Sequence, residues 1–412
     1  NSGLNGDSGM PGHISGQGSA DTPDKAEYSC VRSDITISIG SFKPGHFLNM
    51  AKDVMKRRIN CDIGITPVEK PYYLLEEADI RPFFKKRPNY SHKGKYGYVA
   101  LIGGSKRYSG AIRLASMANA ALLEGCSEFP KRDDSCSPAM LANTAMRSGA
   151  GVVKLAVADS LCPVVASHVL ESTLFPLSDN DGDIRFVEAE IAELISNVKT
   201  VAFGMGIGVT GETAKILDYL LDNYSGRLIV DADGLTLLSK VSTDRILHSK
   251  PELILTPHVK EFSRLLEGRN IDTYSTTIEK AEKYAAMHNV ILLLKGPSTI
   301  ITNGGTTYLT DTGCSGMATA GSGDVLSGIL AATCAYIPEV QACAYTPDDR
   351  DGQISKPVNS SKLLIATAIG AYINGKAGEL AQKKTNSVSM IASDTVSCIT
   401  AVISDFMSES GY

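Results

Sequence analysis

The segment "TAGSGDVLSGILAATCA", residues 319–335, places small residues and two glycines directly before an acid and an apolar helical pattern. The first N–H groups of a helix have no intrahelical partners, and glycines there let a phosphate approach the backbone. Asp324 would lie in the first helical turn, where a carboxylate can take a proton from a hydroxyl that attacks a phosphoryl group. An acid at this position can also merely complement the helix dipole, so the residues alone leave both roles open.

A second glycine motif, "GMGIGVTG", contains Gly206-x-Gly208-x-x-Gly211 between an expected strand and an expected helix. This spacing matches the dinucleotide fingerprint, and Asp231 stands twenty residues after Gly211, where a ribose-binding acid is expected. The motif therefore indicates either nucleotide contact or a tight strand-to-helix turn. Its position in mid-chain, after at least two other expected strands, weighs against a nicotinamide-dependent dehydrogenase.

Two more polar residues follow apolar runs. His258 in "ILTPHVKEF" has Glu261 three residues on, so it could donate to a ligand at a strand end or cap a helix. Lys295 in "LLLKGPSTIIT" is costly to bury unless it meets an anion or reaches solvent, and phosphate is the simplest partner. Residues 103–111, "GGSKRYSGA", form another expected strand–glycine–helix junction. The chain has no GxxxxGK[ST] motif, which excludes a Walker-type ATPase.

The elements that must position these residues alternate from Tyr90 onward. Short apolar runs such as "GYVALIGG", "GVVKLAVA", "RLIVDADG" and "VILLLKG" are separated by amphipathic stretches such as "ETAKILDYLLDNY". In that stretch Ile216, Leu217, Leu220 and Leu221 share one helical face. The pattern predicts an α/β layered fold with a mostly parallel central sheet flanked by helices.

The chain before this region is different. Residues 1–66 offer two strand-like runs, "DITISIGSF" and "INCDIGI", which is too little apolar material for an ordinary domain. Prolines at 67, 71, 82 and 88 predict a linker or docking strap over residues 67–87, followed by the main domain at 88–412. Polar stretches near 125–138 and 338–360 are expected to be surface insertions, to which the sequence assigns no role.

Composition bounds the class of protein. With 412 residues, 43% hydrophobic and 21% charged, the chain is expected to be soluble, globular and of more than one domain. The net charge of −5 suggests neither nucleic acid nor a membrane surface as partner, and no apolar run reaches the roughly 18–20 residues of a spanning helix. The nine cysteines form no CxxC pair, which predicts a reducing compartment, the cytoplasm. Because it begins Asn-Ser-Gly, we expect the chain to be part of a longer protein.

Together these motifs resemble the ADP/ATP-dependent NAD(P)H-hydrate dehydratase family, which has a ribokinase-like fold. The matching pieces, in family order, are "GGSKRYSGAIRLA", "TAMRSGAGVVKLAV", "FGMGIG", "VDADGL", "TPHVKEF", "LKGPSTII" and "TAGSGDVLSG". They cover nearly all of residues 90–335, with a weaker match in "IATAIGAYINGKAGELA". Residues 1–66 resemble the carboxyl-terminal part of the Rossmann-like NAD(P)H-hydrate epimerase domain that precedes the dehydratase in two-function bacterial repair enzymes.

The resemblance implies an enzyme that phosphorylates the ring hydroxyl of hydrated nicotinamide dinucleotide (NADHX or NADPHX), then expels phosphate to give NADH or NADPH. It implies ADP or ATP as co-substrate with Mg²⁺, and the fusion order favours ADP. By resemblance Asp324 is the base, and the N–H groups of Gly321, Ser322 and Gly323 hold the transferring phosphoryl group. The implied nucleotide-binding positions are Lys295, Gly296, Pro297, Ser298, Thr299 and Gly323. The implied hydrate-binding positions are Ala111, Gly206, Gly208, His258 and Asp324.

The epimerase-like region lacks most of that domain's fold. Ser2 matches a family potassium (K⁺) ligand but cannot form the site alone, so we expect no epimerase activity from this chain, although a longer parent would have it. The resemblance also implies a homo-oligomer, a tetramer. Three alternatives stay open: a thiazole or hydroxymethylpyrimidine kinase of the same fold, a nicotinamide-dependent dehydrogenase, and a dinucleotide-binding regulatory module. The sequence does not distinguish NADHX from NADPHX.

Overall fold

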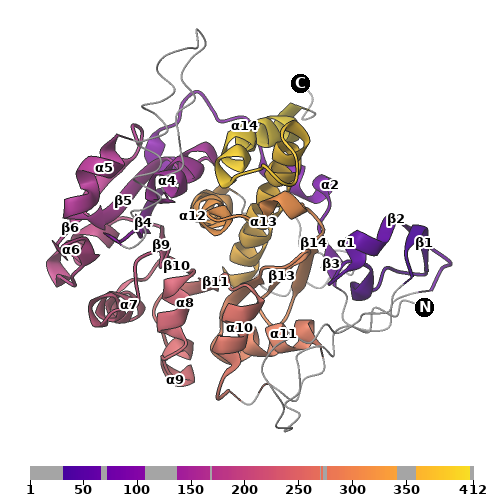
Figure 1. Cartoon of the computed structure of the whole chain (residues 1–412), viewed down its shortest axis with the longest axis horizontal. Coiled ribbons are helices and arrows are strands. Elements are labelled where there is room, and N and C mark those ends of the chain that lie inside the picture. Colours follow the sequence, from indigo (N-terminus) through magenta and orange to yellow (C-terminus); the bar gives the residue numbers. More distant parts are fainter. Residues whose placement is uncertain are drawn as a thin grey trace.

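The computed structural model describes residues 31–65, 72–106, 137–167, 169–269, 271, 276–340 and 359–408. Its centre is a ten-stranded sheet in the order β3-β14-β13-β12-β11-β10-β9-β4-β5-β6 (Figure 1). In that order the strands span Tyr73–Leu74, Thr307–Thr310, Thr299–Thr302, Ile291–Leu294, Glu252–Leu255, Arg227–Val230, Thr200–Phe203, Tyr98–Ile102, Val152–Ala158 and Thr173–Leu177. Only β13 runs against its two neighbours, so the predicted mostly parallel sheet is confirmed.

Helices cover both faces of the sheet (Figure 1). One face carries α4 (Ser137–Arg147), α12 (Ser322–Val340), α13 (Asn359–Lys384) and α14 (Ala392–Ser408). The other carries α6 (Glu188–Ile195), α7 (Gly211–Asn223), α8 (Asp233–Leu238), α9 (Thr243–Leu247), α10 (Val259–Leu266) and α11 (Thr277–His288). In β4, Val99 and Leu101 join the first core and Ala100 and Ile102 the second. Because both of their faces are buried, central strands such as β4 and β12 are apolar runs.

Helix α7 shows how the local sequence sets an element. Thr210 caps it by accepting a hydrogen bond from the Thr213 N–H at 3.1 Å. The apolar face predicted from the 3.6-residue period is buried throughout. The helix therefore begins and packs as its sequence pattern predicts.

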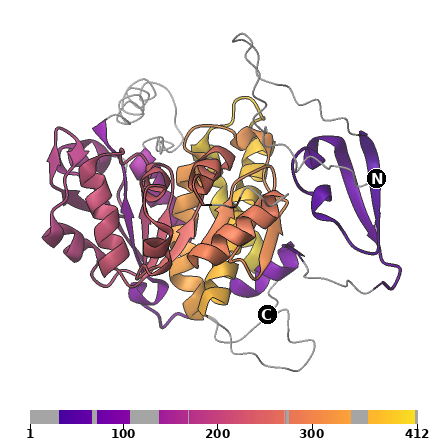
Figure 2. The same ribbon diagram turned by 90° about the horizontal axis from the view of Figure 1, so that it is seen from below.

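The amino-terminal part forms a separate two-stranded parallel sheet. It consists of β1 (Ser33–Ile39), a short helix α1 (Ala51–Val54) and β2 (Met55–Cys61). Figure 2 shows this unit beside the main body rather than within the large sheet. A lone parallel pair is typical of a piece of a larger α/β fold, because parallel strands need crossover connections. The assignment of this unit to an epimerase remnant and the domain boundaries both stay predictions.

Residues 72–87 correct one expectation. The proline spacing predicts a linker or strap over 67–87, but β3 pairs with β14 in the main sheet. After β3 come α2 (Glu77–Ile80) and a buried stretch in which Leu75, Ile80 and Phe84 are at most 5% exposed. The apolar side chains between the prolines favour burial over a free linker, so the strap interpretation describes this segment. Residues 67–71 lie outside the described residues, as do most of the expected insertions at 125–138 and 338–360.

Within the described part of the chain, no helix combines the length and the apolar character that crossing a membrane requires.

Candidate functional site

Three parallel strands deliver polar residues to one edge of the sheet. Asp231 directly follows β10, His258 follows β11 by three residues, and Lys295 directly follows β12. His258 and Lys295 are paired in a parallel bridge, and the Lys295 N–H donates to the Pro257 carbonyl at 2.8 Å. The carboxyl edge of parallel strands is where α/β folds bind ligands.

Asp231 is a buried carboxylate at this edge of the sheet. Its side chain is 2% exposed, and its Oδ1 accepts hydrogen bonds from Lys295 Nζ at 2.9 Å and from the Ala232 N–H at 2.9 Å. Its Oδ2 accepts from Ser327 Oγ of α12 at 2.8 Å. Both carboxylate oxygens therefore have donors, as a buried carboxylate requires. Asp231 thereby links the end of β10, the end of β12 and the start of α12.

Lys295 carries a fixed positive charge at the same place. Its side chain is 24% exposed, and its ammonium lies 3.9 Å from Glu261 Oε2 in addition to the bond with Asp231. The sequence predicts phosphate as its partner, whereas the structure supplies two carboxylates.

The amino terminus of α12 meets this ion pair. Gly321 has a φ of +87°, which glycine adopts without strain, and a methyl group there would lie 2.7 Å from Met140 Cε. A methyl group at Gly323 would lie 3.5 Å from Asp231 Oδ2 and 3.9 Å from Lys295 Nζ. Asp324 is the next residue, in the first turn of α12, and is partly exposed. The structure thus brings Gly323, Lys295 and the first turn that carries Asp324 into one cluster.

His258 caps α10. Its Nδ1 accepts hydrogen bonds from the N–H groups of Lys260 at 3.1 Å and Glu261 at 3.3 Å. In return the His258 N–H donates to Glu261 Oε2 at 2.8 Å, which completes a capping box. The capping alternative is therefore confirmed. Half of the His258 side chain is exposed, with Nε2 3.5 Å from Glu261 Oε1, so a role toward a ligand stays a prediction.

The glycine turn after β9 is held by its neighbours. Gly204, Gly206 and Gly208 all have positive φ, and a methyl group at Gly204 would overlap the Asp231 carbonyl oxygen. The Gly208 N–H donates to Asp233 Oδ2 at 2.9 Å, which ties the turn to α8. The turn therefore needs glycine for its own geometry and packs against the strand end that carries Asp231.

Two features of this turn argue against a dehydrogenase. In the dinucleotide fingerprint the third glycine permits close helix–strand packing, but a methyl group at Gly211 would meet nothing within 4 Å. The acid expected to bind ribose, Asp231, is instead buried and bonded to Lys295 and Ser327. The distance of twenty residues between Gly211 and Asp231 predicts a ribose contact, whereas the fold gives Asp231 a supporting role.

The remaining predicted nucleotide-binding positions differ in how exposed their side chains are. Gly296 and Pro297 are exposed, and Thr299 opens β13. Ser298 is 4% exposed, and its Oγ lies 2.6 Å from the Phe47 carbonyl and 3.0 Å from Asp311 Oδ1, so its side chain is occupied inside the protein. Ala111 and Ser2 lie outside the described residues.

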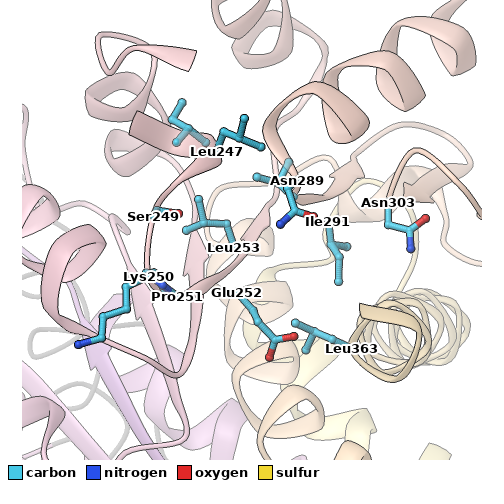
Figure 3. A pocket seen from close by; sticks show the side chains of 12 residues that line it. Leu247, Ser249, Lys250, Pro251, Glu252, Leu253, Asn289, Ile291, Asn303 and Leu363 are labelled. Carbon is cyan, nitrogen blue, oxygen red and sulfur yellow. The ribbon is translucent and has the colours of Figure 1, made fainter. Parts of the chain in front are cut away.

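A pocket of about 210 Å³ lies elsewhere, at the amino ends of β11 and β12 (Figure 3). It is lined by residues 249–253, residues 289–291, Asn303 and Leu363, among others. In Figure 3 the Lys250 side chain points away from the other labelled side chains. The pocket is at the opposite edge of the sheet from His258 and Lys295, so it is separate from the candidate site.

Comparison with protein families and curated proteins agrees with this fold. Residues 131–401 match the NAD(P)H-hydrate dehydratase family. The chain is 29% identical over 388 residues to the bifunctional NAD(P)H-hydrate repair enzyme of Moorella thermoacetica, covering 92% of this chain and 64% of that protein. It is also 29% identical over 313 residues to the ADP-dependent (S)-NAD(P)H-hydrate dehydratase of Cenarchaeum symbiosum, covering 75% of this chain and 90% of that protein. The chain thus spans less than two thirds of the bifunctional relative.

Solved structures show the same fold. A ribokinase-like superfamily protein from Enterococcus faecalis superposes with a TM-score of 0.60 at 20% identity, covering 83% of this chain and 99% of that one. The ADP/ATP-dependent NAD(P)H-hydrate dehydratase of Bacillus subtilis, co-crystallised with ATP and Mg²⁺, gives 0.57 at 22% identity, covering 82% of this chain and 100% of that one. The ribokinase-like expectation for the fold is confirmed.

Proposed function

Because the chain belongs to the NAD(P)H-hydrate dehydratase family, we propose that it converts NADHX or NADPHX to NADH or NADPH while consuming ADP or ATP. The observation that carries the proposal is the placement of Gly323 at the start of α12, where a methyl group on it would lie 3.5 Å from Asp231 Oδ2 and 3.9 Å from Lys295 Nζ. It gathers helix N–H groups, a lysine and the neighbouring Asp324 at one strand edge. Such a set suits phosphoryl transfer to a hydroxyl.

In the first step the ring hydroxyl oxygen forms a bond to the terminal phosphorus of the nucleotide, and the bond to the leaving nucleotide breaks. Asp324 accepts the hydroxyl proton, and ADP leaves AMP whereas ATP leaves ADP. The N–H groups of Gly321, Ser322 and Gly323 and the Lys295 ammonium stabilise the transferring group. In the second step the carbon–oxygen bond breaks, phosphate departs with the electron pair, and loss of a proton from the adjacent carbon restores the ring double bond.

The remaining positions would bind rather than react. Gly206 and Gly208 lie in the turn that packs against the strand end carrying Asp231, which supports their proposed contact with the hydrated dinucleotide. Gly296 and Pro297, exposed after β12, would contact the nucleotide through their backbone. Asp231 would touch neither substrate; it would hold Lys295 and α12 in register. His258 and Ala111 keep the hydrate-binding roles that the resemblance implies.

Mg²⁺ is part of the proposal. Among the described residues no three His, Cys, Asp or Glu side chains form a metal cluster. Mg²⁺ usually takes one or two carboxylates together with substrate phosphates, and Glu261, whose Oε2 also accepts a hydrogen bond from the His258 N–H, is the carboxylate near Lys295 that would supply one of them. Glu261 would hold the ion, whose chemistry there is neutralisation of phosphate charge. A potassium site at Ser2, a tetramer, the domain boundaries and the preference for ADP also remain proposals that rest on the resemblance.

The test is formation of the 340 nm absorbance of NADH from NADHX, with ADP, with ATP and with neither. The wild-type chain is compared with Asp324→Asn, which keeps the shape of the side chain and removes the base. Asp244→Asn is a matched control, because Asp244 also lies in the first turn of a helix but its side chain is 88% exposed. We expect nucleotide-dependent absorbance from the wild type and Asp244→Asn, and a loss of at least about 100-fold in Asp324→Asn.

Other outcomes point elsewhere. Nucleotide consumption with a flat 340 nm trace would indicate a kinase of the same fold. An absorbance change that needs no nucleotide would indicate a dehydrogenase, and binding with no turnover would indicate a regulatory module. Equal activity of Asp324→Asn and Asp244→Asn would remove Asp324 from the mechanism.

A further inference from the structure

A contact between the amino-terminal unit and the main domain has no role in the mechanism above. We propose that Lys52, in α1, is a positioning residue for the nucleotide: it fixes the start of the loop that leads from β14 to the amino terminus of α12. The proposal rests on the proposed function and extends it, since it makes nucleotide use depend on a segment that precedes the dehydratase domain.

Lys52 reaches across the boundary between the two parts. Its Nζ donates to the Thr312 carbonyl at 3.1 Å and to the Gly313 carbonyl at 3.3 Å. Asp311 Oδ1 lies 3.8 Å from the same ammonium, and the Lys52 side chain is 22% exposed. A lysine that is mostly buried keeps its charge only with such partners. Its three partners are consecutive residues at the end of β14, so one side chain holds the point where the loop begins.

Asp311 extends this contact to the nucleotide segment. It forms an ion pair with Arg58 of β2, and Arg58 also donates to the His46 carbonyl at 2.7 Å. Ser298 Oγ lies within hydrogen-bond distance of both Asp311 Oδ1 and the Phe47 carbonyl. Ser298 belongs to the segment 295–299 that would bind the nucleotide. The amino-terminal unit therefore contacts both the nucleotide segment and the loop before α12.

Helix α13 holds the other side of that loop. The Gly313 N–H donates to Glu379 Oε1 at 3.0 Å, and the Gly316 N–H donates to Gln382 Oε1 at 2.9 Å. The loop ends at Gly321, where the proposed anion site begins. It is thus fixed by α13 on one side and by Lys52 on the other. Removing Lys52 frees one side, and it also removes a cationic neighbour of Asp311, which contacts Ser298 of the segment that would bind the nucleotide.

The expected effect is on nucleotide affinity. Loss of the charged donor from two carbonyls should raise the KM for the nucleotide about tenfold, with kcat at saturating nucleotide changed less than about twofold. The catalytic groups themselves are untouched by the change. Lys52→Arg, which keeps charge and donors, should restore most of the affinity.

The experiment uses the full chain with NADHX and varied ADP or ATP, and it also measures nucleotide binding by titration calorimetry. Lys52→Met is compared with Lys56→Met, a matched control from the same unit. Lys56 pairs with Asp34 at 2.6 Å, but both side chains are at least 80% exposed and the pair lies within the amino-terminal unit. We expect weaker nucleotide binding and a higher KM in Lys52→Met alone. If that variant does not fold, Asp311→Asn replaces it and should show the same split.

The outcomes separate this inference from the proposed function. A wild-type chain without nucleotide-dependent turnover contradicts the proposed function, whereas the calorimetric comparison of Lys52→Met with Lys56→Met still tests the contact. An active wild type with equal nucleotide affinity in both variants overturns the inference. A drop in kcat at unchanged KM also overturns it, because that result assigns Lys52 a general structural role.

Discussion

The pair formed by Asp231 and Lys295 makes an asymmetric prediction about stability. Lys295→Met leaves the Asp231 carboxylate buried at 2% exposure with only Ser327 and the Ala232 N–H as donors. Removing one partner of a buried ion pair lowers the free energy of unfolding by about 3–5 kcal/mol. Because two hydrogen-bond donors to Asp231 remain in this variant, we expect a loss of about 3 kcal/mol. Asp231→Asn leaves a lysine that is a quarter exposed and still near Glu261, so its cost is about 1 kcal/mol.

The double variant sharpens the prediction. When Asp231→Asn is combined with Lys295→Met, the methionine no longer faces a buried charge, so the double variant should be more stable than Lys295→Met alone by about 1–2 kcal/mol. The measurement is urea unfolding of all three variants beside the wild type. For a slope of about 3 kcal/mol per molar, Lys295→Met should lower the midpoint by about 1 M.

Lys215→Met is the control, because Lys215 pairs with Glu212 at 2.6 Å on the surface and its side chain is 60% exposed. Its midpoint should stay close to that of the wild type. A Lys295→Met midpoint as high as the control's, or a double variant less stable than both single variants, would show that Asp231 is not a buried charge held by Lys295.

Three further predictions concern stability. Burial lowers the pKa of His288 below its ordinary value; Arg269 nearby acts in the same direction, and a hydrogen bond to the Tyr284 carbonyl opposes it. As the pH falls, the unfolded chain therefore protonates His288 before the folded chain does, and the urea midpoint should fall between pH 7.5 and pH 5.5. His288→Gln should reduce this dependence of the midpoint on pH. Ala232 has a φ of 49° and a ψ of −119°, so Ala232→Gly should relieve backbone strain and raise the free energy of unfolding in urea by about 1 kcal/mol. A less stable Ala232→Gly variant would show that this backbone conformation is not strained. Gly103→Ala would place a methyl group 2.5 Å from the Met205 carbonyl oxygen and should lower the free energy of unfolding by at least about 2 kcal/mol in the same assay. Gly211→Ala has open space around the added methyl group and should leave the stability unchanged or raise it. Equal urea midpoints for the two variants would contradict the close packing at Gly103.

The sequence predicts the layers of this fold well because its strongest signals are local. Apolar runs become strands such as β4 and β12, and the 3.6-residue period of α7 predicts its buried face. The sequence pattern predicts less well those elements whose burial depends on partners that are distant along the chain. Residues 73–74 carry no strand pattern of their own and join the sheet only because β14 offers an edge. Proline spacing there predicts a linker or a docking strap, and only the pairing with β14 favours the strap.

The candidate site follows the same division. Helix-terminus chemistry predicts the place of Gly323 and Asp324, because the glycines and the apolar run that follows are adjacent in the sequence. The role of Asp231 is not predictable in this way. Its partners Lys295 and Ser327 are 64 and 96 residues away, and only the strand order brings them together. The contact of Lys52 with Thr312 spans 260 residues and has no local pattern at all.

Under the proposed function, nucleotide consumption and ring dehydration are one coupled reaction at the start of α12. The most direct measurement is the stoichiometry of products from NADHX and ADP in a single reaction: NADH by absorbance, AMP by chromatography and free phosphate by colour assay. Coupling of the two steps predicts one AMP and one phosphate for each NADH. AMP formed with a stable phosphorylated dinucleotide and no NADH, or NADH formed without AMP, would contradict it.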